Sequence, residues 1–181
     1  SSLSLRISLR NSAQTYMDKL LKLTNETVIL TTFGSRYSTL IVDQKISNEP
    51  IKFISTVGLE YPSYSSAMGK AMLAYLPQEK IKDYIDHVSL RKETEFTIST
   101  PEALQSELEL VHKRGYATDL QESVLGLTCI AAPVFSVNGR LEGALGISGL
   151  IFRITGTKMG NFISAVCEQA ALLSASLGYR I

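Results

Sequence analysis

One stretch of the sequence, residues 115–149, constrains the fold of this chain more than any other. It holds two runs of strand-like composition that are joined at Asn138-Gly139. Asn-Gly between apolar runs is the strongest short-range signal for a β-hairpin, because both residues tolerate the backbone angles of the tight turn. Antiparallel pairing about this tip predicts three opposed pairs: Pro133 with Ala144, Ala131 with Gly146, and Cys129 with Ser148.

Directly opposed residues share a face of the hairpin, and its two predicted faces differ. One carries ordinary core residues: Ile130, Ala132, Val134, Leu141, Leu145 and Ile147. The other is made of small residues with a thiol and a hydroxyl: Cys129, Ala131, Pro133, Ala144, Gly146 and Ser148. Small residues leave room either for a packed helix or for a small ligand that touches Cys129 and Ser148. The pattern alone leaves both readings open.

The composition indicates one globular domain with a substantial core, because 45% of the 181 residues are hydrophobic. The net charge of +1 lacks the electrostatic footprint of a nucleic-acid binder. The chain shows neither an apolar run of about 20 residues nor a leader, so we expect a cytoplasmic protein without a membrane partner. Two histidines and two cysteines lie in four separate predicted elements, and no phosphate-loop or dinucleotide fingerprint appears. We therefore expect no metal and no cofactor.

Hydrophobic periodicity and capping residues place the other elements. Residues 1–10 alternate as a strand does and are read as a strand, a linker or a remnant of cloning. Helices are predicted over residues 11–25, 64–76, 78–87, 100–114 and 159–177. Strands are predicted over residues 27–33, 37–43 and 51–57, and residues 60–62 are expected to break regular structure.

Strands and helices are segregated along the chain rather than alternating. This order predicts an α+β fold with a mostly antiparallel sheet of about six strands, helices on one face and a ligand pocket on the other.

The helix predicted to start after Ser66 opens with small residues, Ala67 and Gly69. A helix N-terminus exposes unpaired N–H groups, so this opening lets a carboxylate or phosphate approach the backbone. Lys70 either adds charge there or points to solvent.

Asp119 and Glu122 precede the hairpin, while Cys129 and Ser148 lie within it. A small organic acid needs such a set: amides for its carboxylate, and Asp119, Cys129 and Ser148 for its remaining oxygens. Nothing in the set forces bond breaking, so binding is favoured over catalysis. The rival readings are a free-standing enzyme that uses Cys129 as its nucleophile and, third, a redox sensor.

Two stretches resemble the signatures of one family. Residues 65–74, SSAMGKAMLA, resemble SAxGKAxLA, and residues 115–134, GYATDLQESVLGLTCIAAPV, resemble GYaxDxxE…GxxCiAaPV. Residues 144–149, ALGISG, fit the closing strand of the same family. The chain thus resembles the effector-binding domain of isocitrate lyase regulator (IclR) type transcriptional regulators.

The resemblance implies a GAF-like domain over residues 11–181 that forms homodimers or homotetramers. Members normally carry an N-terminal winged helix-turn-helix domain that contacts DNA, which is absent from this chain. The implied effector is a small organic acid whose binding rearranges the oligomer and so alters DNA binding, in activators or repressors. Its implied contacts are backbone amides at Ala67 and Met68, next to Gly69, polar groups of Asp119, Cys129 and Ser148, and a wall at Leu127.

Two positions depart from the family pattern. Gly146 stands where other members can carry a serine that points into the pocket, and Tyr64 stands where many have histidine. The lost hydroxyl and the added space at Gly146 favour a different or larger effector, such as a sugar acid or an aromatic acid.

Overall fold

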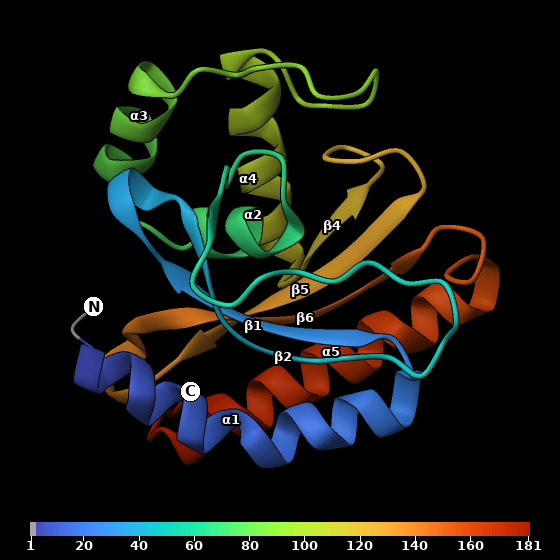
Figure 1. Cartoon of the computed structure of the whole chain (residues 1–181). Coiled ribbons are helices and arrows are strands. Elements are labelled where there is room, and N and C mark those ends of the chain that lie inside the picture. Colours follow the sequence, from blue (N-terminus) through green and yellow to red (C-terminus); the bar gives the residue numbers. More distant parts are fainter. Residues whose placement is uncertain (1–2) are drawn as a thin grey trace.

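The computed structural model describes residues 3–181, and all structural statements refer to that part of the chain. Its six strands form one antiparallel sheet in the order β3-β2-β1-β6-β5-β4 (Figure 1). The strands are β1 (Thr27–Phe33), β2 (Thr39–Lys45), β3 (Glu60–Tyr61), β4 (Ala117–Leu120), β5 (Leu127–Phe135) and β6 (Leu141–Leu150).

The α-helices of the described chain lie on both sides of this sheet (Figure 1), so the prediction of helices on one face and a pocket on the other is wrong in that detail. Two long helices, α1 (Leu3–Thr24) and α5 (Gly156–Ser176), lie against each other across one face. On the opposite face α2 (Ala67–Leu73) packs on β5 and β6, with α4 (Pro101–Arg114) and α3 (Gln78–His87) beyond it. The sheet therefore separates two hydrophobic cores.

The central hairpin forms as the sequence predicts. Cys129 lies opposite Ser148, Ala131 opposite Gly146, and Pro133 opposite Ala144. Asn138 and Gly139 adopt positive φ angles of 60° and 71° at the tip, which these two residue types tolerate. The register shifts only near the tip, between Val134 and Phe135, so the pairs farther from it are unaffected.

The first helix begins at Leu3, so the strand-like reading of residues 1–10 is wrong over the residues described; Ser1 and Ser2 lie outside them. Leu9 is buried together with Ala13 and Met17, four residues apart, and these side chains form one continuous helical stripe against the sheet. The alternation at the N-terminus is thus the exposed end of a helix rather than a strand, and the helix is continuous across residues 10 and 11.

The third strand was expected over residues 51–57, and that prediction is also wrong. No strand forms there, and Ile51, Ile54 and Val57 are exposed. The short strand β3 lies instead at Glu60–Tyr61, where regular structure was expected to break, and it pairs with Thr39 and Leu40 of β2. An apolar β-branched run forms a strand only when a partner buries it, and here none does.

Candidate functional site

A cavity of about 220 Å³ lies between the start of α2, the sheet and the loop that joins β4 to β5. Its lining is mostly apolar, with hydroxyl groups, one carboxyl and one thiol. The lining residues are Ile29, Thr39, Ile41, Ile54, Ser55, Tyr61, Pro62, Ser65, Ser66, Ala67, Met68, Asp119, Ser123, Val124, Leu127 and Cys129.

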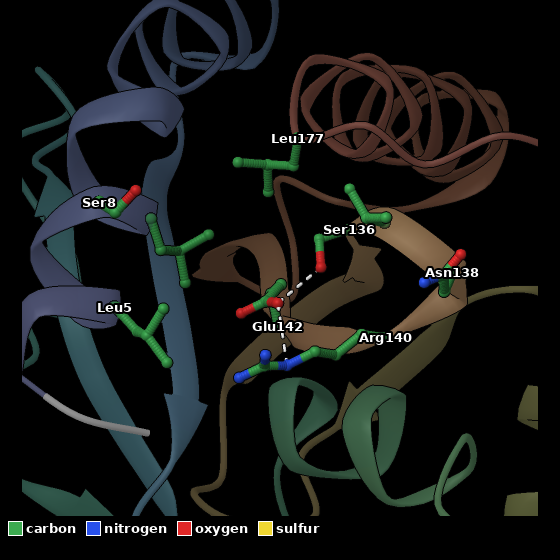
Figure 2. A pocket seen from close by; sticks show the side chains of 9 residues that line it. Leu5, Ser8, Ser136, Asn138, Arg140, Glu142 and Leu177 are labelled. Carbon is green, nitrogen blue, oxygen red and sulfur yellow. Dashed lines mark hydrogen bonds and ion pairs between the residues drawn. The ribbon is translucent and has the colours of Figure 1, made fainter.

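A larger hollow, about 500 Å³, lies between the first turns of α1 and the tip of the β5–β6 hairpin (Figure 2). Arg140 and Ser136 both contact Glu142 there, so its polar groups are partly engaged with each other. None of the predicted site residues lines this hollow. Most of the predicted site residues line the smaller cavity instead.

Five of the eight predicted site residues line the smaller cavity: Ala67, Met68, Asp119, Leu127 and Cys129. Gly69 does not, because it packs directly against Ser63. Ser148 is buried opposite Cys129, and Gly146 lies two residues before it on the same face of β6, but neither belongs to the lining.

Met68 explains why Gly146 is outside the cavity. A Cβ atom built on Gly146 would lie 2.4 Å from Met68 Cε and 2.2 Å from the carbonyl oxygen of Ile130. The space expected above Gly146 is therefore filled by the Met68 side chain, and the expectation of added room at this position is wrong. The small-residue face carries the packed helix, because α2 packs on Ala131 and Ala144, and Cys129 on the same face lines the cavity.

The start of α2 presents backbone donors to the cavity. Ser66 Oγ accepts the N–H of Gly69 at 2.9 Å and so caps the helix. The N–H groups of Ala67 and Met68 precede the first intrahelical bond, and within residues 3–181 they have no acceptor. These two amides are therefore available to a ligand oxygen.

Asp119 faces the cavity and also organises the loop that follows β4. Its Oδ1 accepts the N–H of Glu122 at 2.7 Å and that of Ser123 at 3.3 Å, and its Oδ2 accepts the Ser123 hydroxyl. Burial raises the pKa of Asp119, and these hydrogen bonds and Lys70 counteract only part of that shift. The carboxyl group thus sits in the wall, largely engaged with its own loop.

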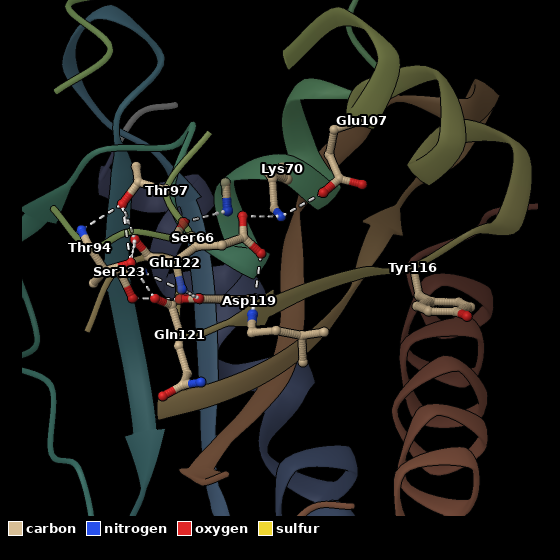
Figure 3. Close-up of polar contacts among 12 residues, drawn as sticks. Ser66, Lys70, Thr94, Thr97, Glu107, Tyr116, Asp119, Gln121, Glu122 and Ser123 are labelled. Atoms are coloured by element: carbon tan, nitrogen blue, oxygen red, sulfur yellow. Dashed lines mark hydrogen bonds and ion pairs between the residues drawn. The ribbon is translucent and has the colours of Figure 1, made fainter. Parts of the chain in front are cut away.

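Lys70 lies neither in solvent nor at the cavity, contrary to both expectations. Its side chain is fully buried, and Nζ lies 2.7 Å from Glu122 Oε1 and 3.0 Å from Glu107 Oε2 (Figure 3). Burial raises the pKa of Glu122 despite this ion pair. Lys70 therefore ties α2 to α4 and to the β4–β5 loop.

The loop between β4 and β5 is held from a second side by two threonines. Thr97 Oγ1 donates to the Glu122 carbonyl at 2.6 Å, and Thr94 Oγ1 donates to the Gln121 carbonyl at 2.6 Å (Figure 3). The segment that follows α3 thus positions the loop that carries part of the cavity wall.

Cys129 is buried, and burial raises the pKa of its thiol well above the ordinary value; nearby Asp119 and Glu122 raise it further. An activated nucleophile needs the opposite shift, because the thiolate is the reactive form. Neither His87 nor His112 lines the cavity, since His112 bonds the Ala74 carbonyl and His87 is exposed. The reading of Cys129 as a nucleophile therefore has no support in the geometry.

Tyr64 also points away from the cavity. Its hydroxyl donates to the Arg91 carbonyl at 2.5 Å, and its N–H donates to the Tyr84 hydroxyl at 3.1 Å. Tyr64 thus forms a hydrogen bond with the segment after α3 and does not line the cavity.

Sequence reasoning missed much of the lining. For Ile29 the sequence did contain a signal, the alternation of side chains along β1. This alternation places Ile29 on the face opposite to that of Val28 and Leu30, where it pairs with Gly146. For Ile54 and Tyr61 the sequence contained no such signal. The segments that hold them were predicted incorrectly, residues 51–57 as a strand and residues 60–62 as a break in regular structure.

Neither a metal-binding cluster nor a membrane-spanning helix occurs within residues 3–181. No group of three or more His, Cys, Asp or Glu side chains there is arranged to hold a metal ion. No helix of the described chain has the length and apolar character needed to cross a membrane.

Sequence comparisons identify the family. The model of "Bacterial transcriptional regulator IclR C-terminal" matches residues 3–175. The HTH-type transcriptional regulator KdgR of Escherichia coli K12 is 32% identical over 174 residues, covering 96% of this chain and 65% of the relative. The transcriptional repressor IclR of E. coli K12 is 31% identical over 144 residues, covering 80% and 53%. The chain spans less than two thirds of each of these relatives.

Solved structures agree with the sequence match. The crystal structure of Thermotoga maritima IclR superposes with a TM-score of 0.91 at 33% identity, covering 98% of this chain and 72% of that one. The C-terminal domain of E. coli KdgR gives 0.85 at 32% identity, covering 94% and 99%. An IclR homolog from Microbacterium hydrocarbonoxydans, complexed with 4-hydroxybenzoate, gives 0.85 at 20% identity, covering 97% and 70%, which shows the fold alone.

These matches confirm the predicted α+β, GAF-like fold, and the relatives named are regulators and repressors rather than enzymes. The chain therefore belongs to the C-terminal family of bacterial IclR transcriptional regulators.

Proposed function

We propose that this chain is the ligand-sensing domain of an IclR-type regulator and that its effector, a small organic acid, binds in the 220 Å³ cavity. One observation carries the proposal. Ala67 and Met68, whose N–H groups have no acceptor within residues 3–181, line the same cavity as Asp119 and Cys129. The amides suit a carboxylate, and the two side chains suit a hydroxyl or carbonyl oxygen on the same molecule.

The apolar part of the lining favours an acid with a hydrocarbon body. Ile29, Ile41 and Leu127 line the cavity beside the polar groups, and together they provide the few oriented polar contacts in an apolar surround that small-molecule sites show. Aromatic acids are included among the candidates, since a fold neighbour is described with 4-hydroxybenzoate bound.

The same proposal places this domain beside an N-terminal helix-turn-helix domain in a cytoplasmic protein. The effector would bind one arrangement of a homodimer or homotetramer more tightly and so shift its population. A coupling free energy of about 1–3 kcal/mol then changes how the attached DNA-binding domains are spaced. The length of the relatives supports this assignment, because this chain covers 65% of KdgR and 53% of IclR.

A thermal-shift screen of the chain against small carboxylic, keto and sugar acids and 4-hydroxybenzoate tests the proposal. A ligand that binds only the folded state raises the melting temperature by mass action. We expect at least one hit, which isothermal titration then quantifies.

Val124→Trp and Leu125→Trp assign the hit to the cavity. Val124 is half-exposed and lines the cavity, whereas its neighbour Leu125 is exposed and does not line it. The tryptophan at 124 should block entry and weaken binding about tenfold or more, equivalent to roughly 1.4 kcal/mol. Equal affinity in the two variants would place the ligand elsewhere.

A further inference from the structure

Met68 forms the boundary of the cavity toward strand β6. Met68 is 4% exposed and is one of the residues that line the cavity, and its Cε atom lies over Gly146, 2.4 Å from where a Cβ atom would stand. Gly146 pairs with Ile29 on one side and with Ala131 on the other, so the boundary lies over the centre of the sheet.

The strand beneath this boundary carries only small residues on this face, and the Met68 side chain occupies the space above Gly146. Ala144, Gly146 and Ser148 follow one another on this face of β6, and Ser148 lies opposite Cys129, which lines the cavity. Removing the Cγ, Sδ and Cε atoms of Met68 would therefore join the cavity to the surface above Gly146. Methionine is unbranched and adaptable, so this boundary is made of a side chain rather than backbone.

The volume of the cavity limits what fits on the near side of Met68. An apolar cavity of about 150 Å³ holds a benzene molecule. A cavity of about 220 Å³ therefore has room for a single small ring or a short branched chain together with its carboxyl group. A larger body that extends toward β6 meets the Met68 side chain.

We propose that Met68 is the residue that sets the size of the ligand, restricting this protein to acids with one small ring or a short chain. The inference rests on the proposed function, because it assumes that the cavity is the effector site. It assigns the specificity for ligand size to a methionine at the second position of α2. The side chain of this methionine packs over Gly146, which has no Cβ atom.

Binding of a graded series of acids tests the inference. The probes are straight-chain carboxylates from propanoate to octanoate, together with benzoate and 2-naphthoate, titrated against the 181-residue chain and its Met68→Ala variant. Affinity of the wild type should rise roughly fourfold per buried methylene until the cavity is full and then stop rising. In Met68→Ala the rise should continue to longer chains, and 2-naphthoate should bind at least about tenfold more tightly than it binds the wild type.

Met72→Ala is the matched control. Met72 lies one turn later on α2 and is fully buried, with Sδ 3.8 Å from Thr31 Oγ1, but it does not line the cavity. This variant loses the same buried atoms and should keep the wild-type preference for size. A Met68→Ala profile identical to the wild type, or an equal change in Met72→Ala, would overturn the inference.

Crystals soaked in iodobenzene separate this inference from the proposed function. If no acid binds wild type or variants, the proposed function fails for these probes, while the boundary can still be examined directly. An iodine peak above Gly146 in Met68→Ala that is absent from the wild type supports the boundary. Collapse of Met72 or of the strands into that space, with no such peak, refutes it.

Discussion

The ammonium group of Lys70 lies in the interior between two carboxylates, those of Glu122 and Glu107. Taking three charged groups out of water is costly, and only their close mutual contacts offset that cost. The group therefore behaves as a unit in which each member depends on the others. Its place on the first helical turns of α2 makes it part of the support for the cavity wall.

Replacing Lys70 by methionine should destabilise the domain by about 3–5 kcal/mol, because the buried Glu122 carboxylate and the partly buried Glu107 carboxylate lose their counter-charge. Urea-induced unfolding measures this change. The control is Lys82→Met, which breaks an exposed ion pair with Asp86 and should leave the unfolding free energy nearly unchanged. A small effect of Lys70→Met would mean that the carboxylates are reached by water.

Asp119 should make stability depend on pH in a defined direction. Burial raises its folded-state pKa above the ordinary 3.8, so the folded chain binds more protons than the unfolded chain between these two values. The contribution of Asp119 to stability is thus fully present below the unfolded pKa and is lost as pH rises through the folded pKa. Relative to Asp119→Asn, the wild type should be more stable near pH 4 than near pH 7.

Unfolding of both proteins by urea at the two pH values gives this difference directly. Asparagine keeps an oxygen for the Glu122 and Ser123 N–H groups, so the loop should stay formed. A difference that grows with rising pH would contradict the raised pKa.

At the level of single residues, the sequence was informative where a contact is set by register. The Asn-Gly tip fixed Cys129 opposite Ser148 by counting, and the structure agrees. Lys70 was not predictable in this way, because Glu107 and Glu122 lie 37 and 52 residues away along the chain and no local pattern connects them.

The end of β6 packs so tightly on the start of β1 that a glycine is required there. A Cβ atom on Gly149 would lie 2.7 Å from Glu26 Oε1, and the Glu26 carboxylate receives two hydrogen bonds from the Arg153 guanidinium. Arg153 also donates to the Ile51 carbonyl at 2.9 Å. This pair of a buried carboxylate and a partly buried guanidinium joins the residue before β1, the turn after β6 and the loop that follows β2.

Gly149→Ala should therefore cost about 1–3 kcal/mol, because the methyl group displaces a buried and paired carboxylate. Gly160→Ala is the matched control with the opposite sign. Gly160 lies inside α5 with open space around its Cα, so alanine there should stabilise the helix by about 0.5–1 kcal/mol. Thermal unfolding of the two variants measures both effects, and a stabilising Gly149→Ala would show that the Glu26 carboxylate can move freely.

Among the elements, those with strong local signals were predictable. The helix α4 has Thr100 as its cap, Pro101 at its first position and Gly115 with φ of 87° at its end, all as expected. The run of residues 51–57 has the composition of a strand, but its conformation depends on whether a neighbouring strand is free to pair. That information is not local, and the prediction failed there.

On the scale of the whole molecule, the sheet divides the interior into a core under α1 and α5 and a core under α2. Cys129 belongs to the α2 core and is buried, whereas Cys167 on α5 is partly exposed. The two thiols therefore differ in how exposed they are to solvent in the folded domain.

The rates of thiol labelling should distinguish Cys129 from Cys167. In a Cys167→Ala variant, Cys129 is the one remaining thiol, and its reaction with an aromatic disulfide reagent should be slow, because it is buried at the cavity and is reached only when the outer wall or the whole domain opens. The labelling rate should rise with urea as these openings become more frequent. Cys129→Ala, which leaves Cys167, should react faster in native buffer, and rapid native labelling of Cys129 would instead revive its reading as an accessible reactive group.

The cavity has a floor of paired strands and an outer wall of irregular chain, to which Ile54, Ser55 and Val124 contribute. Opening a segment that no ladder holds is easier than parting a sheet, so a ligand bound at the proposed site should enter and leave through the outer wall. The rates of association and dissociation then depend on how often the segments around Ile54 and Val124 move, whereas the affinity depends on the floor. A change that stiffens the outer wall should slow both rates together and lengthen the residence time of the ligand, with little change in the equilibrium.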